Sequence, residues 1–489
     1  MSRLAILLAI LVCCSRLASD ARAEVRLPKV FTEGMVLQQQ MPIRLWGWAT
    51  PGEEVTAEFL GQLQKTKASE KGTWRIELPA AAASSKPQEL TIAGKNKIVL
   101  RNVLVGEVWL AVGQSNMSRG LRYVKDRITK EPMDFPELRL FFVGLDQVPQ
   151  REEAAVTRGW APATHAAMRE TFVHPTLGPY EFSEVTYYFG KQVHEQLGVP
   201  VGMISCAFPG STAAQWTPAD KPEERFDFAA AKPDKGPGSM YQAMLLGLPP
   251  LGIRGVIYYQ GENDASNPHY ERELTSLIGS WRARFERPDM PFFMTQLGQT
   301  TFGGGTLRVI ATQQAIVAKI PHTGLAGSND LIDGANPAKA KERLDQESGF
   351  PIVGGGDPHP PNKHVVAGRL ARLALGITYG KLAGEASGPM VESQEVRGEA
   401  LRVKFRHAGK GLKTDDGAGP NWFQLAGAEG KWVAAEAKIV APDTIELKAA
   451  ALSTPQRFRF AWHALARHNL YNSDGLPAIP HSGEFPSKP

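Results

Sequence analysis

Cysteine is scarce in this sequence of 489 residues, which contains three. Cys13 and Cys14 lie in the N-terminal stretch MSRLAILLAILVCCSRLASDARA, where one arginine precedes the apolar run Leu4–Val12 and small residues surround the final ARA. This order is typical of a secretory signal peptide, and we predict cleavage after Ala23. The mature chain would then keep only Cys206, which excludes an internal disulfide. A lone cysteine after an apolar strand is more often buried than catalytic.

Long hydrophobic runs and a large charge excess are also missing. The apolar run of the signal is too short to cross a bilayer as a resident helix, and no later segment suits a membrane anchor. Loss of residues 1–23 removes three arginines and one aspartate, so the formal net charge falls from +5 to +3. So small an excess gives no reason to expect nucleic acid or a membrane surface as a partner. We therefore expect a secreted or periplasmic protein, of an oligomeric state that the sequence does not indicate.

What the sequence does contain divides it into three regions after the signal. Residues 24–100 hold short runs rich in β-branched and aromatic residues, separated by Gly, Pro and Lys, which indicate a β domain. Residues 101–385 alternate apolar strands with helical periodicity, which predicts an α/β domain with a mostly parallel sheet covered by helices. Residues 386–489 return to a β pattern. The expected fold class is thus α/β, flanked by N- and C-terminal β-sandwich-like regions.

The stretch VGQSNMSRGL places Ser115 after an expected strand at 107–112 and at the start of a helix. Serine is strongly preferred as a helix N-cap, which is one explanation. The other is a nucleophile, because ligands of doubly wound sheets bind at the carboxyl ends of strands and the first helical N–H groups are free there. Met117 occupies the second glycine position of G-x-S-x-G, which argues against the α/β-hydrolase elbow.

The stretch GGGDPHPPNK contains Asp357 and His359, each followed by proline. A residue before proline is pushed toward an extended conformation, and residues two apart in an extended chain point the same way. A carboxylate beside an imidazole can hold the histidine in the tautomer that acts as a base. The alternative is a proline-rich turn with two polar surface residues.

Two further stretches, YYQGENDA and AFPGSTAAQW, each follow an expected strand. A side-chain amide from Gln260 or Asn263 can donate to an oxyanion, which is typically worth about 10²–10³ in rate. Gly210 allows its backbone N–H to approach a ligand closely. Each stretch alone could be an ordinary turn. Together with Ser115 and His359 they supply the nucleophile, base and donors that acyl transfer needs.

Three stretches in this order, GEVWLAVGQSNM, YYQGENDA and HPPNKHVVAGRLARLAL, resemble the sialate O-acetylesterase family of the SGNH-type (GDSL-like) serine esterases. The opening VRLPKVFTEGMVLQQQMPIRLWGWATPGEEV and the ending NLYNSDGLPAIP resemble it as well, so the likeness covers nearly the whole mature chain. It implies a flavodoxin-like SGNH catalytic domain that removes acetyl groups from sugars. It makes Ser115 the nucleophile and His359 the base. Gly210, the N–H of Ser115 and either Gln260 or Asn263 would form the oxyanion hole.

The chain departs from the family pattern at several points. SRG follows Met117 where the family usually reads GQSNMEW, and FPGS replaces WGGT. The acid of the superfamily commonly lies three residues before the histidine, a position that Gly356 occupies here. We therefore take Asp357 as the acid, with Asp330 and Asp333 as alternatives. These differences affect the choice of sugar more than the chemistry.

The expected function is that of a secreted serine esterase that hydrolyses O-acetyl groups of carbohydrates through an acetyl-enzyme on Ser115. Sialic acid and plant-type polysaccharides such as acetylated xylan or pectin fit equally well as substrates. A non-catalytic carbohydrate-binding protein of the same fold is the alternative from another class. No H-E-x-x-H motif or cluster of histidines is present, so the sequence predicts neither a metal nor another cofactor.

Overall fold

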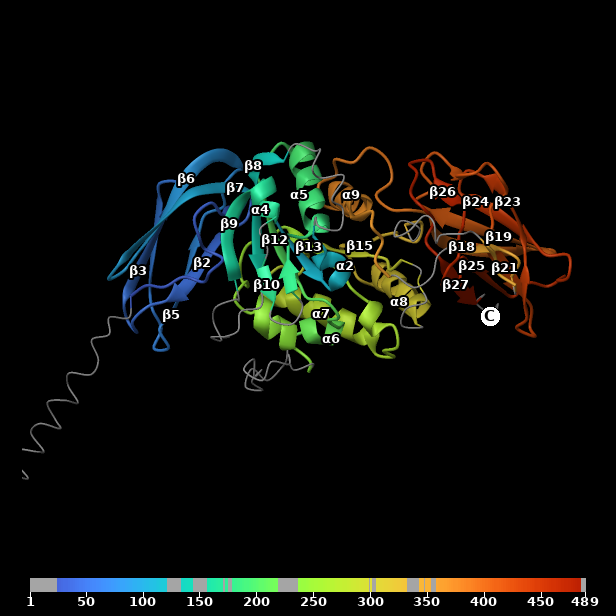
Figure 1. Cartoon of the computed structure of the whole chain (residues 1–489), viewed down its shortest axis with the longest axis horizontal. Coiled ribbons are helices and arrows are strands. Elements are labelled where there is room, and N and C mark those ends of the chain that lie inside the picture. Colours follow the sequence, from blue (N-terminus) through green and yellow to red (C-terminus); the bar gives the residue numbers. More distant parts are fainter. Residues whose placement is uncertain are drawn as a thin grey trace, which may run out of the picture.

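The structure is a computed structural model of the whole chain (Figure 1). It describes residues 24–120, 133–143, 156–169, 172–174, 178–218, 236–298, 300, 305–331, 343–346, 348–352 and 358–484. The predicted signal peptide at residues 1–23 therefore lies outside the described residues.

A mixed sheet forms the centre of the molecule. Its order is β15-β14-β13-β7-β12-β8-β9, parallel from β15 to β8, with β9 antiparallel at one edge. The strands are β7 (Lys97–Gly113), β8 (Asp134–Val143), β9 (Val156–Thr164), β12 (Val201–Ala207), β13 (Gly255–Tyr259), β14 (Phe292–Thr295) and β15 (Thr323–Ala326). Because β7 lies in the middle with β12 on one side and β13 on the other, its carboxyl end is the point where the connections diverge to opposite sides.

Helices cover both faces of this sheet. Figure 1 shows α5 (Glu184–Leu197) and α9 (Lys363–Leu373) on one face, with α7 (Tyr270–Arg284) and α8 (Thr306–Lys319) on the other. Helix α5 packs against α9, and α7 against α8. Shorter helices are α2 (Ser115–Ser118), α4 (His165–Arg169) and α6 (Ala213–Trp216). Among the described residues, every helix is too short or too polar to traverse a lipid bilayer.

Local sequence signals explain where α5 begins and ends. The Ser183 side chain accepts a hydrogen bond from the Thr186 N–H at 3.1 Å, which satisfies one of the free donors of the first turn. Gly198 ends the helix with φ +65°, a left-handed conformation that glycine adopts without steric cost. The helix lies where its apolar spacing predicts it.

Strand β7 differs from the sequence-based expectation. The runs NKIVLRNVLVG and EVWLAVG suggest two separate strands, but Lys97–Gly113 form one strand of 17 residues. Its first part pairs with β6 and β1, and its second part pairs with β12 and β13. The predicted boundary between residues 100 and 101 thus falls within β7. Pairing partners from distant parts of the chain keep the strand continuous, and no local pattern announces them.

Among the strands before β7, β3 pairs antiparallel with β4 and β6, β2 pairs antiparallel with β5, and β1 pairs parallel with β7. Their bounds are β1 (Val36–Gln38), β2 (Ile43–Trp48), β3 (Glu54–Phe59), β4 (Gln62–Lys67), β5 (Thr73–Leu78) and β6 (Ser84–Ala93). Two strand pairs lie elsewhere: β10 (Phe172–His174) with β11 (Gly178–Tyr180), and β16 (Arg343–Leu344) with β17 (Pro351–Ile352).

The C-terminal region consists of antiparallel sheets with the orders β18-β19-β24-β23 and β22-β21-β25-β27, and the pair β20-β26. The bounds are β18 (Met390–Arg397), β19 (Ala400–Arg406), β20 (Leu412–Thr414), β21 (Phe423–Ala426), β22 (Trp432–Ala434), β23 (Glu436–Ala441), β24 (Thr444–Lys448), β25 (Arg457–Phe460), β26 (Leu470–Asn472) and β27 (His481–Glu484). This region has a hydrophobic core of its own, whereas the N-terminal strands share one core with the central sheet.

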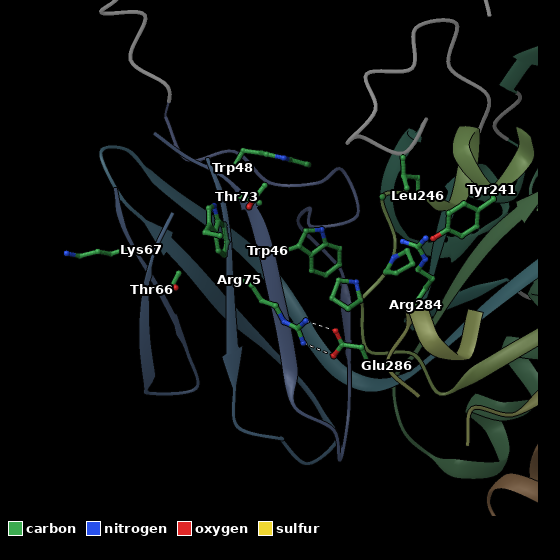
Figure 2. Close-up of a pocket in the computed structure, with 15 residues that line it drawn as sticks. Trp46, Trp48, Thr66, Lys67, Thr73, Arg75, Tyr241, Leu246, Arg284 and Glu286 are labelled. Atoms are coloured by element: carbon green, nitrogen blue, oxygen red, sulfur yellow. Dashed lines mark hydrogen bonds and ion pairs between the residues drawn. The ribbon is translucent and has the colours of Figure 1, made fainter. Parts of the chain in front are cut away.

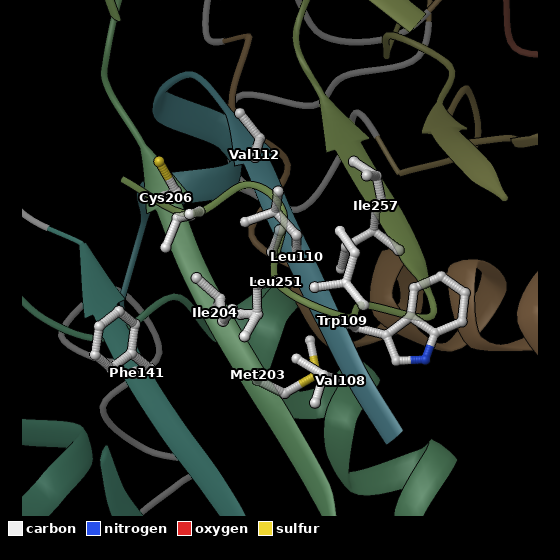
Figure 3. Packing of buried hydrophobic residues seen from close by; sticks show 14 of the residues in the cluster. Val108, Trp109, Leu110, Val112, Phe141, Met203, Ile204, Cys206, Leu251 and Ile257 are labelled. Carbon is white, nitrogen blue, oxygen red and sulfur yellow. The ribbon is translucent and has the colours of Figure 1, made fainter. Parts of the chain in front are cut away.

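The core around β7 is apolar on both faces of the sheet (Figure 3). Trp109 is fully buried, packs edge-on against Phe189 of α5, and donates from Nε1 to the Tyr379 hydroxyl at 2.9 Å. Cys206 is free and fully buried, and burial raises the pKa of its thiol well above the usual value. A thiol in this position is part of the packing, because a buried neutral thiol is a poor nucleophile.

Candidate active site

Ser115 lies at the carboxyl end of β7, as expected, but it does not cap the helix. Gln114 occupies the N-cap position of α2 and makes no side-chain cap bond, while Ser115 is the first helical residue. Gly113 makes the sharp exit from β7 possible, because a Cβ at that position would overlap the carbonyl oxygen of Tyr259. The Ser115 hydroxyl is thereby left for another partner.

That partner is His359, whose Nε2 lies 2.8 Å from the Ser115 Oγ. The two residues are 244 positions apart and both are half-buried. His359 lies in the segment that leads into α9, between Pro358 and Pro360, whose fixed φ angles restrict the backbone on both sides. A serine hydroxyl within hydrogen-bond reach of an imidazole is the geometry of an activated nucleophile.

A buried polar network holds the two segments together. Asn116 donates from Nδ2 to Glu262 Oε1 and, at 2.9 Å, to the Pro358 carbonyl oxygen, while Lys363 Nζ donates to Asn116 Oδ1. Asn116, Glu262 and Lys363 are all at least 95% buried. The network joins the residue after Ser115 to the residue before His359 and to the first residue of α9.

Lys363 and Glu262 are both ionisable groups in this network. The Lys363 ammonium lies 4.9 Å from the centroid of the Tyr259 ring, so the aromatic face contributes to its stabilisation. Burial raises the pKa of the Glu262 carboxyl, and this effect exceeds the opposing effects of the Asn116 hydrogen bond and the Lys363 charge. Neither Asn116 nor Lys363 is predicted as a site residue from the sequence. The feature of the sequence that could have indicated them is proximity to the predicted site. Asn116 directly follows Ser115, and Lys363 lies four residues after His359.

Gln260 and Asn263 occupy different environments, although both belong to the same turn. Gln260 is fully buried, and its Nε2 donates to the Ser211 carbonyl at 3.0 Å and to Asp264 Oδ2 at 2.5 Å. Asn263 is exposed, and its Nδ2 donates to the Gly210 carbonyl at 2.7 Å. Both hydrogens of the Gln260 amide are therefore used in the interior, whereas Asn263 lies at the surface beside Gly210.

The turn is also fastened to the segment that carries Ser115. The side-chain oxygen of Gln114 accepts hydrogen bonds from the Gly261 and Asn263 backbone N–H groups, both at 3.4 Å. Gly210 is exposed and has φ +71°, in the left-handed region that favours glycine. Ser115, Gly210 and Asn263 thus come from three strand ends that these contacts bring to one edge of the sheet.

Asp330 is the candidate acid whose contacts the structure describes. Asp357 and Asp333 lie outside the described residues. Asp330 accepts hydrogen bonds from the Arg369 guanidinium through both carboxylate oxygens, at 2.7 and 2.6 Å. This bidentate pair occupies Asp330 with a structural contact to α9.

Comparisons with known proteins agree with this architecture. Residues 105–337 match the family described as carbohydrate esterase, sialic acid-specific acetylesterase. Sialate O-acetylesterase of Rattus norvegicus is 25% identical over 93% of this chain and 92% of its own length. The enzyme of Homo sapiens is 26% identical over 76% of this chain and 74% of its own. The crystal structure of a carbohydrate acetylesterase from Xanthomonas citri superposes with a TM-score of 0.77 at 28% identity, covering 94% of this chain and 99% of that one.

These likenesses define the class of protein: the chain is an ester hydrolase, and its mixed sheet with helices and additional β-rich regions fits a carbohydrate esterase fold. The resemblance to the sialate O-acetylesterase family is confirmed by the match of residues 105–337 to the carbohydrate esterase model and by the curated sialate O-acetylesterases.

Proposed function

We propose that this carbohydrate O-acetylesterase works through a covalent acetyl-enzyme on Ser115, with His359 as the base. The observation that supports this mechanism is the 2.8 Å separation of Ser115 Oγ and His359 Nε2. His359 takes the hydroxyl proton as Oγ attacks the acetyl carbonyl carbon. The same imidazole then gives the proton to the sugar oxygen as the C–O bond breaks. Water, deprotonated by His359, attacks the acetyl-enzyme and releases acetate, which restores the serine.

The negative oxygen of each tetrahedral intermediate needs donors that face it. We assign this role to the backbone N–H groups of Ser115 and Gly210 and to the side-chain amide of Asn263. Asn263 is the better candidate of the two amides because the Gln260 hydrogens already have acceptors in the interior. Gln260 then holds the turn in place. One hydrogen of Asn263 Nδ2 bonds to the Gly210 carbonyl, and we assign the other hydrogen to the oxyanion.

Asp357 is the acid in this proposal. It lies two residues before His359 and is separated from it by Pro358, so an extended segment places both side chains on the same side. Asp330 is less suited because its carboxylate is engaged by Arg369. The role of the acid is to orient the imidazole and to stabilise its charged form.

The finer description of the fold is part of the proposal. The strand order β12-β7-β13-β14-β15 is the 2-1-3-4-5 order of flavodoxin-like domains when β7 is counted as the first strand and β8 and β9, which extend the sheet beyond β12, are counted as additions. This order and the position of Ser115 after β7 support assignment to the SGNH superfamily. We propose a catalytic domain over residues 101–385, joined through the continuous strand β7 to a β-sandwich-like region over 24–100, and a second such region over 386–489. We also propose export to the periplasm or the exterior, directed by residues 1–23.

The substrate is an O-acetylated carbohydrate. The curated relatives are sialate O-acetylesterases and the solved structure is a carbohydrate acetylesterase, so O-acetylated sialic acid and O-acetylated polysaccharide fragments are the two classes to compare. Acetate release from O-acetylated sialic acids, acetyl-xylo-oligosaccharides and acetyl-pectin fragments, each measured as kcat/KM, separates them.

The mechanism is tested with Ser115→Ala and with Ser118→Ala as its matched control. Both serines lie in α2, and the Ser118 hydroxyl donates to the Ser115 carbonyl at 3.3 Å. We expect Ser115→Ala to abolish acetate release from 4-nitrophenyl acetate, and Ser118→Ala to keep most of it. Rapid acid quenching of the wild-type enzyme during turnover, followed by mass spectrometry, should find one acetyl group on the peptide that contains Ser115. Full activity of Ser115→Ala would refute the assignment.

A further inference from the structure

A pocket of about 660 Å³ lies between the N-terminal strands and the central domain. Strands β2, β4 and β5 form one wall, and the segment 246–250 with the end of α7 forms the other. Figure 2 shows Trp46 on the first wall, facing Leu246, Tyr241 and Arg284 on the second. The volume lies in the range of about 300–1,000 Å³ that small-molecule sites usually occupy.

This pocket is separate from the candidate active site. Arg284 is the last residue of α7, and Tyr270, its first residue, follows the turn that carries Asn263. A helix of 15 residues is roughly 22 Å long, so Arg284 lies about that far from the turn next to Ser115. Segment 246–250 precedes β13 and therefore lies at the amino ends of the strands, opposite Ser115.

One wall presents aromatic side chains. Trp46 and Trp48 are two residues apart on β2, so they point to the same face of the strand, and both are half-buried. The Trp46 ring is supported from behind by Phe31, with ring centroids 4.6 Å apart in an edge-to-face arrangement. Gly47 lies between the two tryptophans, at a position that requires glycine, because a Cβ there would overlap the carbonyl oxygen of Arg26 and press on Trp74.

The pocket also carries a positive charge excess. Arg75 is neutralised by Glu286 through contacts of 2.5 and 2.8 Å, and this ion pair closes one end of the pocket (Figure 2). Lys67 and Arg284 are exposed, and neither makes an ion pair with a described residue. Figure 2 shows the Lys67 side chain extending away from the pocket, so Arg284 is the cation that lies at the pocket without an acidic partner in the described part of the chain.

We propose that this pocket is a second, non-catalytic binding site for a sugar that carries a carboxylate. Indole faces stack on the apolar C–H face of a pyranose ring, which suits Trp46 and Trp48. The hydroxyl groups of Thr66 and Thr73, which also line the pocket, can bond to sugar hydroxyls. Arg284 supplies the planar fork of donors that matches a carboxylate.

The two sources of such a ligand are a sialic acid residue and a uronic acid residue of a polysaccharide. Either would let the protein hold one part of a glycan while another part, or another chain, reaches Ser115. A single pyranose fills only part of the pocket, so an oligosaccharide should bind more tightly than a monosaccharide.

The test uses the Ser115→Ala protein and probes that carry no O-acetyl ester, so the result does not depend on the esterase mechanism. Calorimetric titration is carried out with trigalacturonic acid, with 3′-sialyllactose and, as a neutral probe, with xylotriose. We expect at least one acidic probe to bind more tightly than xylotriose, with an affinity that falls as salt is added.

Variants locate the binding. Arg284→Gln should weaken binding of the acidic probe about tenfold or more, because one charge-assisted contact is lost. Arg284→Lys should retain part of it, and Trp48→Ala should weaken both acidic and neutral probes. Arg272→Gln is the matched control, since Arg272 is an exposed arginine of the same helix outside the pocket. Melting temperatures confirm that the variants are folded.

Binding of all probes with equal affinity, no binding of either acidic probe, or an unchanged affinity in Arg284→Gln would overturn the proposal. Acetate release from 4-nitrophenyl acetate by Arg284→Gln in the Ser115 background should equal that of the parent. A failure of the esterase mechanism would appear instead as retained acetate release by Ser115→Ala, which these titrations do not measure.

Discussion

Lys363 donates a buried hydrogen bond to Asn116, and this contact joins the first residue of α9 to the residue that follows Ser115. The two are 247 positions apart in the chain. Asn116 also holds the Pro358 carbonyl oxygen, so the segment that carries His359 is attached on both sides of the histidine. The Ser115–His359 distance therefore depends on a polar network in the interior as much as on the two residues themselves.

This dependence can be tested with Lys363→Met, which keeps the length of the side chain and removes its charge. Asn116 Oδ1 then loses its donor, and a buried polar atom without a partner costs about 1–3 kcal/mol. We expect that loss in the free energy of unfolding measured with urea, together with a fall of about tenfold or more in kcat at a nearly unchanged KM. Lys97→Met, at an exposed lysine of β7, is the control. An unchanged kcat in Lys363→Met would show that the network does not position the site.

The two amides of the QGEN turn should respond differently to substitution by alanine. Asn263 is exposed, so Asn263→Ala should leave stability within about 0.5 kcal/mol and lower kcat about 10²–10³-fold if it serves the oxyanion. Gln260→Ala removes three buried hydrogen bonds and should lower the free energy of unfolding by about 2 kcal/mol or more. The measurements are kcat and the free energy of unfolding in urea for both variants, which together test which amide serves the oxyanion. The reverse pattern would exchange the two roles.

Glu107 lies where β7 enters the central sheet and ties the strand to its surroundings. It is 1% exposed and accepts hydrogen bonds from Gln39 Nε2 at 2.7 Å, Arg254 Nε at 2.6 Å and the Tyr379 hydroxyl at 2.9 Å. Glu107→Ala leaves the Arg254 guanidinium without its partner in the interior. We expect a loss of about 3–5 kcal/mol in the free energy of unfolding.

The control for this prediction is the surface ion pair of Lys65 and Glu54, which are 3.5 Å apart with more than half of each side chain exposed. Glu54→Ala should cost less than about 1 kcal/mol, because water and salt screen exposed pairs. Urea titrations measure both losses. Equal losses in the two variants would contradict the structural role of Glu107.

The stability of the protein should fall in mild acid because of buried histidines in the C-terminal region. Burial lowers the pKa of His468 from 6.5 to about 4, and its Nε2 accepts a hydrogen bond from Asn329 Nδ2, which requires the neutral ring. Between pH 6.5 and 4 the unfolded chain binds more protons than the folded one. The free energy of unfolding is therefore complete above pH 6.5 and decreases as the pH falls through this window, by up to about 3 kcal/mol for this residue.

Replacement of His468 by Gln should reduce this dependence on pH, as measured by urea unfolding at pH 7.5, 5.5 and 4.5. A smaller dependence persists in the variant, because burial also lowers the pKa of His481 to about 4. His269→Gln is the control, since His269 is exposed. A pH dependence that is the same in the parent and in His468→Gln would contradict the prediction.

Much of the architecture follows from local patterns. The spacing of apolar residues and the flanking Ser183 and Gly198 predict α5 with its ends, because the cap and the left-handed glycine are local interactions. The apolar run before Ser115 predicts a buried strand with a polar residue at its end. The continuity of β7 was missed, since it depends on β6, β1, β12 and β13, which the run itself does not reveal.

The sequence by itself determined the class of chemistry, because a serine at a strand end, a histidine between prolines and an amide-rich turn are residue types with few joint uses. Only the tertiary structure decided which of them meet: it placed His359 Nε2 at Ser115 Oγ, turned Gln260 inward and left Asn263 at the surface. The physical reason is that a local pattern sets a backbone conformation, whereas the distance between residues 115 and 359 is set by the packing of the whole sheet and by the buried contacts of Asn116 and Lys363.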